Sequence, residues 1–172
     1  ELVFDEQHFE RVVRRGMLKT TSSIAIATAD LKAMLVPTGA GRADSIISHL
    51  SRQAGLGVEV RILHAGIPSA PALKELKHTL PTNMIVRRCP RLHAKAIILD
   101  AGAMYLGSAN VTGAGLGAKG PTRRNIEWGI WTEDESLIEA VLGQFNRLWE
   151  GERCEDCGRR DICPTPLEEP DL

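Results

Sequence analysis

Four polar residues in the middle of the chain have the types and the spacing needed to cleave a phosphodiester. His93 and Lys95 stand two apart before an apolar stretch, and Ser108 and Asn110 stand two apart at the end of the next apolar stretch. Residues two apart on a strand point to the same face, so both pairs converge if the two stretches form paired strands. A histidine supplies a nucleophile or an acid near neutral pH. The ammonium, hydroxyl and carboxamide groups supply hydrogen-bond donors for the non-bridging oxygens as negative charge develops.

These residues belong to a longer pattern: H-x-K, four residues, D, six residues, then G-S-x-N. The pattern is complete as His93, Lys95, Asp100, Gly107, Ser108 and Asn110. It resembles the signature of the phospholipase D superfamily, and the likeness covers roughly residues 4–150. The resemblance implies a two-step hydrolysis that needs no metal. One histidine attacks phosphorus to form a phosphohistidine while a second protonates the leaving oxygen. Water activated by the second histidine then releases the product.

Members of this family need two such motifs, and this chain has one. None of the other histidines is followed by lysine at the required spacing; they are His8, His49, His64 and His78. The resemblance therefore implies a symmetric homodimer in which two motifs meet across a two-fold axis.

Two acidic residues accompany the motif. Asp100 lies at the expected hairpin turn, where Asp is common, and we expect it to support the site without touching substrate. Glu127 matches the acidic residue that the family often carries further along. It would orient His93 or form an ion pair with it, as carboxylates do in other histidine sites. The alternative is a solvent-facing strand residue.

The flanking sequence predicts alternating helices and strands, followed by a hairpin. Helical spacing of apolar residues predicts helices at 4–19, 46–54, 69–80 and 134–150, with a short helix at 30–34. Apolar runs predict strands at 22–29, 58–65, 83–89 and 126–133, and a hairpin of 94–100 with 103–109. The Pro- and Gly-rich segment 37–45 is predicted to be a loop. The fold class is therefore α/β, a mixed sheet with helices on both faces, as in phospholipase D-like endonucleases.

Length and composition favour one soluble globular domain with an appendage. We expect a phosphodiesterase domain at 1–150 and an acidic, cysteine-containing tail at 151–172. A content of 43% hydrophobic and 25% charged residues excludes a disordered chain. No apolar run approaches the roughly 18–20 residues that span a bilayer, and no signal segment opens the chain, so we expect a cytoplasmic protein. Because the first residue is Glu1, we also expect the chain to have been processed or cut from a longer one.

Charge is distributed unevenly along the chain. The overall charge of −1 divides into −5 from Glu150 onward and +4 before it. Basic residues border the motif on both sides, where neutralising phosphates would raise affinity for nucleic acid most. They are Arg87, Arg88 and Arg91 before it, and Lys119, Arg123 and Arg124 after it. Because aromatic residues are few, we expect contacts with the nucleic-acid backbone and no base-stacking platform.

The four cysteines form a second set of interest. Cys154, Cys157 and Cys163 follow the pattern C-x2-C-x5-C, and Cys89 lies four residues before His93. Four thiolates are enough for structural zinc or an iron–sulfur cluster. The tail also resembles the cysteine staple of RecB-type and CRISPR-associated exonucleases, which holds a four-iron cluster; this favours iron–sulfur over zinc. Free or disulfide-paired thiols are the alternative.

The sequence therefore predicts a homodimeric nuclease that cuts DNA or RNA without a catalytic metal. Two alternatives use the same residues differently. One is a phospholipase D-type enzyme that cleaves a lipid phosphodiester, and the other is a nucleic-acid-binding module that has lost turnover.

Overall fold

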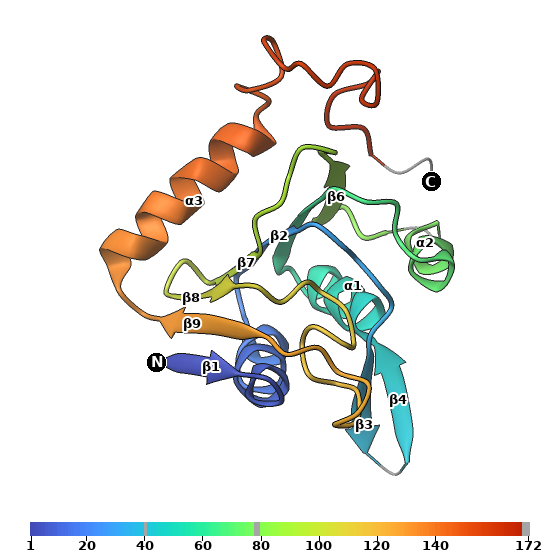
Figure 1. The fold of residues 1–172 in the computed structure, drawn as a ribbon. Coiled ribbons are helices and arrows are strands. Elements are labelled where there is room, and N and C mark those ends of the chain that lie inside the picture. The colour runs from blue at the N-terminus through green and yellow to red at the C-terminus, as the bar shows by residue number, and fades with distance from the viewer. Residues whose placement is uncertain (40, 78–79, 170–172) are drawn as a thin grey trace.

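The computed structural model describes residues 1–39, 41–77 and 80–169. Seven of the described strands form one mixed sheet in the order β1-β9-β8-β7-β2-β5-β6 (Figure 1). Their bounds are β1 Leu2–Phe4, β2 Ser23–Thr28, β5 Glu59–His64, β6 Met84–Arg88, β7 Ala96–Leu99, β8 Ala103–Gly107 and β9 Trp128–Thr132. Strands β2, β5 and β6 are parallel, and the other pairs are antiparallel. The predicted mixed sheet is confirmed.

Helices cover both faces of this sheet, also as predicted. Helix α3 (Glu135–Trp149) lies on one face, while the π-helix η1 (Phe9–Arg14) and α1 (Ile46–Gly55) lie on the other (Figure 1). The alternation along β2 explains both layers, because neighbouring strand residues point to opposite faces. Ile24 and Ile26 pack in the core on the η1 side, and Ala25 and Ala27 pack in the core under α3.

Local signals fix where the longer helices begin. The Ser45 side chain accepts a hydrogen bond from Ser48 N and caps α1, and Asp134 does the same for α3 through Leu137 N. Such caps satisfy backbone donors that have no partner inside the helix. The shorter α2 (Ala70–Leu76) begins with a proline in its first turn, as helices tolerate.

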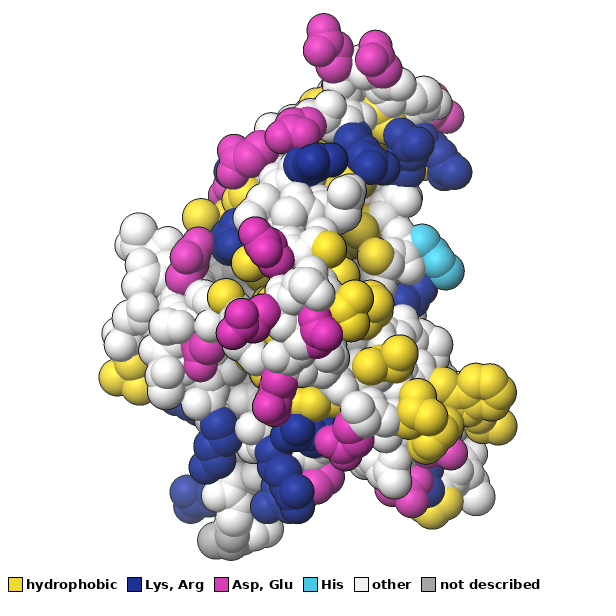
Figure 2. All heavy atoms as spheres, turned by 90° about the vertical axis from the view of Figure 1, so that its left-hand side faces the viewer, with side chains coloured by type: hydrophobic (Ala, Val, Ile, Leu, Met, Phe, Trp, Pro, Cys, Tyr) yellow, Lys and Arg dark blue, Asp and Glu magenta, His cyan; other side chains and the backbone are white. Residues whose placement is uncertain are grey.

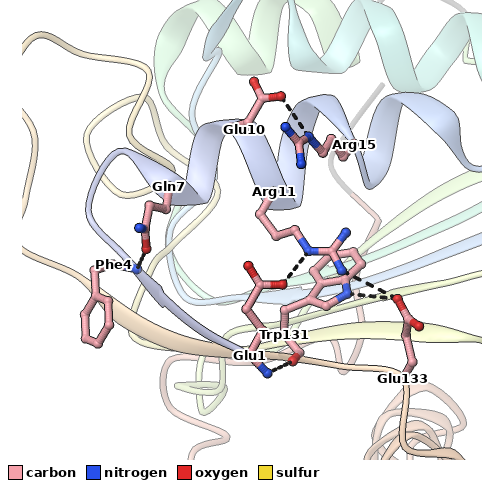
Figure 3. Close-up of polar contacts among 8 residues, drawn as sticks. All are labelled: Glu1, Phe4, Gln7, Glu10, Arg11, Arg15, Trp131 and Glu133. Atoms are coloured by element: carbon pink, nitrogen blue, oxygen red, sulfur yellow. Dashed lines mark hydrogen bonds and ion pairs between the residues drawn. The ribbon is translucent and has the colours of Figure 1, made fainter.

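The first segment differs from the single predicted helix. Residues 4–19 divide into the end of β1, η1 and a 3-10 turn, η2 (Met17–Lys19). The break falls at Gly16, where an added Cβ would lie 2.9 Å from the Trp131 ring. Helix and sheet therefore approach too closely there for a larger residue. Figure 3 shows how η1 is tied to β9: the Arg11 guanidinium lies 4.3 Å from the centre of the Trp131 ring and 3.5 Å from Glu133.

Two other predictions were wrong. Residues 30–34 are not helical, because Leu31 forms a bridge with Val111 and Lys32 N donates to Val111 O, which holds the segment extended. Residues 37–45 are not a loop, because β3 (Leu35–Gly39) and β4 (Arg42–Ser45) pair as a small separate sheet. The helix predicted at 69–80 ends at Leu76, and residues 78 and 79 lie outside the described residues.

The tail folds back after α3. From Gly151 to Glu169 it contains no helix or strand, and Arg88 N donates to Glu168 O, so the tail returns beside β6. Among the described helices, none is long and apolar enough to span a membrane.

Candidate active site

The hairpin of β7 and β8 brings the two polar pairs to one end of the sheet. Lys95 immediately precedes β7 and Ser108 immediately follows β8. The strands pair antiparallel with Ala96 opposite Leu106, and Gly107 N donates to Lys95 O at 3.2 Å. The end of one strand therefore lies beside the start of the other, and the two pairs meet.

His93 is accessible to a substrate. Its side chain is exposed, as a nucleophile must be, and the Lys95 ammonium lies 3.2 Å from its Nε2. Lys95 Nζ also donates to His93 O at 2.8 Å, which holds the ammonium beside the ring. A phosphoryl group attacked by His93 would therefore meet a positive charge at once.

The carbonyl oxygen of Asn110 is already bound within the chain. Oδ1 accepts hydrogen bonds from Ala29 N at 3.0 Å and Asp30 N at 3.1 Å. Thr28 Oγ1 donates to the same oxygen at 3.2 Å. Since two of these donors are backbone N–H groups, the accepting atom must be the amide oxygen. The Nδ2 donors are left for a phosphate oxygen.

Glu127 binds Ser108 and not His93. Its carboxylate accepts a short hydrogen bond from Ser108 Oγ and a second from Asn125 Nδ2 at 2.9 Å. Trp128 N in turn donates to Ser108 Oγ at 3.1 Å. Among the described contacts Glu127 has none with His93, and its residue is only 7% exposed. Within one chain the carboxylate is engaged by Ser108 and Asn125, and its expected pairing with His93 stays a prediction.

Asp100 lies at the far end of β7 from Lys95, at the hairpin turn where it was predicted. Its backbone is left-handed, with φ of 53°, and its carboxylate accepts from Ser22 N at 2.7 Å and Ser23 N at 2.9 Å. Burial raises the pKa of Asp100, but the donors from Ser23, Ser22 and Thr21 outweigh it and leave the pKa below its ordinary value. Asp100 thus joins β2 to the hairpin and lies away from the substrate.

A buried pair beneath the motif went unnoticed in the sequence. His8 Nε2 lies 3.0 Å from Tyr105 Oη, and both residues are fully buried. Tyr105 Oη accepts from Ala109 N at 3.1 Å, between the two motif residues Ser108 and Asn110. Burial lowers the pKa of His8 and raises the pKa of Tyr105 to about 12. No spacing signal connects residues 97 apart, so only the fold reveals the pair.

Two glycines make room for this tyrosine. A Cβ added at Gly129 would lie 2.2 Å from the Tyr105 ring, and one at Gly107 would lie 2.4 Å from its hydroxyl. The glycine before Ser108 therefore has a packing reason in this chain: Tyr105 occupies the space that a side chain there would need.

The basic residues expected to bind nucleic acid divide into two groups. Arg87 donates to Trp149 O at 3.0 Å, and Arg88 forms an ion pair with Glu168. Arg124 pairs with Glu6 at 3.0 Å. Each of these three arginines has a partner within the chain, and its assignment to phosphate stays a prediction. The exposed residues of the set are Arg91, Lys119 and Arg123.

The cysteines gather beside the motif. Cys89 and the three tail cysteines line one cavity of about 210 Å³ that His93 also borders. All four are free thiols. Burial, Cys89 and Cys163 raise the pKa of Cys154, and Arg160 opposes them. Within the described ranges no three His, Cys, Asp or Glu side chains already stand in the geometry of a metal centre.

Comparisons with known proteins agree with this architecture. The family model described as cardiolipin synthase, PLD-like domain, matches residues 14–149. The phospholipase D family member Nuc from Salmonella typhimurium has a TM-score of 0.61 at 18% identity, with 87% of this chain and 93% of that chain covered. NucT from Helicobacter pylori has a TM-score of 0.61 at 16% identity, with 87% and 94% covered.

The archaeal chromatin protein TrmBL2, whose structure is described as showing a novel mode of DNA binding, shares the fold more loosely. Its TM-score is 0.57 at 15% identity, and the alignment covers 87% of this chain and 51% of that chain. No curated protein matches the chain in sequence. At such identities the structural likeness shows the fold, while the family model covers most of the chain. The chain belongs to the phospholipase D-like family and has the fold of its short bacterial members, a family whose chemistry is phosphodiester cleavage.

Proposed function

We propose that this protein is a homodimeric nuclease that hydrolyses DNA or RNA through a phosphohistidine intermediate. The observation that carries the proposal is the exposed His93 with the Lys95 ammonium beside it, at the end of the β7–β8 hairpin from which Ser108 and Asn110 follow. The other described histidines do not offer a second reactive ring, because His8 and His64 are buried and His49 lies on α1. His78 lies outside the described residues. The second histidine would come from another copy of the chain.

An uncovered apolar surface supports the second copy. Leu2, Ile130 and Leu106 lie opposite one another on β1, β9 and β8, and Phe4 lies opposite Trp128. We call these five residues the sheet-edge patch; all are exposed, Trp128 by 68%. Figure 2 shows hydrophobic side chains gathered at the lower right of this face of the molecule. Exposed apolar patches of this kind mark interaction sites.

The patch adjoins the motif, because Trp128 N donates to Ser108 Oγ. A second copy docked on it about a two-fold axis would bring its own motif close to this one. We assign the patch to a second copy of this chain because one chain supplies only one of the two histidines that the proposed mechanism needs.

In this proposal the hydrolysis takes two steps. The ring nitrogen of His93 attacks phosphorus, the bond from phosphorus to the leaving oxygen breaks, and the partner subunit's His93 gives that oxygen a proton. The same imidazole then takes a proton from water as the oxygen of water attacks phosphorus and the phosphorus–nitrogen bond breaks. Lys95 and Asn110 donate to the non-bridging oxygens in both steps. Glu127 fixes Ser108 and is a positioning residue.

Nucleic acid is the favoured substrate because exposed cations remain beside the site. Arg91 directly precedes the His93 loop, and Lys119 and Arg123 lie in the loop after Asn110. A phosphate backbone is bound mainly by such charges. Within this proposal residues 1–150 form the catalytic domain and residues 151–172 form an appended tail. The cysteines take no part in hydrolysis. The cytoplasmic location stays a prediction.

The test is cleavage of single- and double-stranded DNA and RNA in excess chelator. We expect wild type to cut, His93→Ala to lose activity, and the control His49→Ala to keep it, because His49 lies on α1. Light scattering should give the mass of a dimer, and Trp128→Asp should shift it to a monomer and remove activity. A confirmed dimer that cuts phospholipid vesicles, or that binds nucleic acid without cutting it, would refute the nuclease.

A further inference from the structure

All four cysteines of the chain line one cavity between the tail and the loop that leads to His93. Cys89 follows β6, while Cys154, Cys157 and Cys163 come from the tail after α3. Two segments far apart in sequence thus bring every thiol of the chain to one place, and the hydrolysis proposed above uses none of them.

The tail is folded around its thiols. Between Glu152 and Thr165 the three cysteines are the only residues that are not exposed, and the segment contains no helix or strand. Its one large apolar side chain, Ile162, is 45% exposed. Such a segment has neither buried apolar side chains nor the backbone hydrogen bonds of a helix or strand. It therefore needs a cross-link to offset the conformational entropy lost on ordering. The half-buried thiols are the groups that could supply it.

Local hydrogen bonds already shape the tail into thiol-bearing turns. Cys154 N donates to Gly151 O at 2.8 Å, and Cys157 N donates to Cys154 O at 3.3 Å. Arg160 Nη2 donates to Cys154 O at 2.8 Å. Two cysteines separated by two residues on such a turn present both sulfurs to one side, which is the usual spacing of paired metal ligands.

The charge around the cavity favours an anionic occupant. Four arginines are among the residues that line the same cavity: Arg91, Arg153, Arg159 and Arg160. Figure 2 shows basic side chains gathered near the top of the molecule. A divalent cation held by four thiolates carries a net charge of −2, and these arginines offset it.

We propose that Cys89, Cys154, Cys157 and Cys163 form a metal–thiolate centre that anchors the tail beside His93. Each S–H bond breaks, its proton passes to solvent, and each sulfur forms one bond to the metal, with no change in oxidation state. The occupant is either one Zn²⁺ ion or a preformed four-iron cluster, which four thiolates hold equally well. Since no three ligands yet stand in metal-binding geometry among the described residues, the sulfurs must close on the metal. A tail without helix or strand can make that adjustment.

The first test is metal analysis of the full chain purified without oxygen. Elemental analysis should find about one zinc per chain, or about four irons with acid-labile sulfide and visible absorption. Either result supports the centre and identifies it. Cys157→Ser should lose the metal, and Glu155→Gln, an exposed neighbour, should keep it. Less than about a tenth of an equivalent, after reconstitution with zinc and separately with iron and sulfide, would overturn the centre. A disulfide found by mass spectrometry in the fresh protein would also overturn it.

The second test reads the anchoring directly and does not depend on activity. Trypsin cuts after Arg153, Arg159 and Arg160, which are exposed in the tail. We expect these bonds to resist cleavage in the metal-loaded protein and to be cut at least tenfold faster once the metal is removed. Cleavage after Arg42 in the β3–β4 hairpin is the internal control and should be unchanged. Equal tail cleavage with and without metal would contradict the proposal, even if the metal binds.

Discussion

Tyr105 donates a hydrogen bond to Nε2 of His8, 3.0 Å away, directly beneath the motif. The direction follows from the neighbours: Tyr105 Oη already accepts from Ala109 N, and His8 Nδ1 lies 2.9 Å from Asp5 O. Because Asp5 O can only accept, Nδ1 carries a proton, and burial lowers the pKa of His8 and so favours the neutral ring whose Nε2 accepts from Tyr105. The chain of bonds runs from the Asp5 carbonyl to the backbone between Ser108 and Asn110, so it fixes where those two side chains point.

Breaking this chain should destabilise the protein. Tyr105→Phe leaves Ala109 N and His8 Nε2 without buried partners, which costs about 1–3 kcal/mol each before relaxation. We expect a lower free energy of unfolding by denaturant and weaker activity. The control is Met104→Leu on the same strand, a volume-conserving change that should cost less than about 1.5 kcal/mol. Equal losses in both variants would mean that packing and not hydrogen bonding matters here.

Stability should fall as the solution becomes mildly acidic. Burial lowers the pKa of His8 in the folded protein, so below its ordinary value of 6.5 the unfolded chain binds more protons. The free energy of unfolding then decreases as pH falls from about 6.5 toward the folded pKa. Unfolding by denaturant at several pH values between 5 and 8 should show this dependence of the free energy of unfolding on pH. His8→Gln should flatten it in part, since the pKa of His64 is also lowered by burial. An unchanged slope would exclude His8.

Asp100 should matter for stability and not for chemistry. Asp100→Asn weakens the acceptor for Ser22 N and Ser23 N while tolerating the left-handed backbone. We expect a loss of about 1–2 kcal/mol in unfolding free energy with little change in kcat. Lys95→Met should do the opposite, removing turnover while leaving stability nearly unchanged. A large kcat effect in a well-folded Asp100→Asn would place Asp100 in the site after all.

Glu127 should act through Ser108. Glu127→Gln keeps a hydrogen-bonding group of the same size but weakens the bond from Ser108 Oγ, so kcat should fall by about 10² or less. The pH profile of kcat/KM should keep its shape, because no described contact joins Glu127 to His93. A displaced histidine limb in that profile would show that the carboxylate acts on His93 in the dimer. If Glu127 acts through Ser108, Ser108→Ala should lower kcat by the same factor as Glu127→Gln.

The two groups of basic residues should separate in binding assays. Arg123→Ala should weaken DNA binding and reduce the salt slope of the affinity by about one charge, because the side chain is exposed beside the motif. Arg87→Ala should leave the slope unchanged and lower the stability, because that guanidinium stacks on Trp149 at 4.6 Å and donates to its carbonyl oxygen. A lower salt slope for Arg87→Ala would show that this guanidinium also binds phosphate.

Much of the fold follows from local pattern. The alternation in 22–29, the hairpin around Asp100 and the apolar spacing of α3 each depend on residues within a few positions of one another. These elements form at or near the predicted bounds. Segment 30–34 was predicted incorrectly because a distant partner decides it: Val111 holds Leu31 extended. Segment 37–45 was predicted incorrectly although its partner is local, because its Pro and Gly residues do not prevent β3 and β4 from pairing as a hairpin.

The motif, its spacing and the hairpin that carries it follow from the sequence alone, because strand periodicity places residues two apart on one face. The contacts of each side chain depend on the packed fold. The packed fold joins Glu127 to Ser108 by a hydrogen bond and binds the Asn110 amide oxygen through Ala29 N and Asp30 N. It also places His8 under the site. It also turned Arg87 and Arg88 inward and gathered the cysteines. The physical reason is range: periodicity is local, whereas these contacts join residues far apart in sequence and exist only after the sheet and its helices have packed.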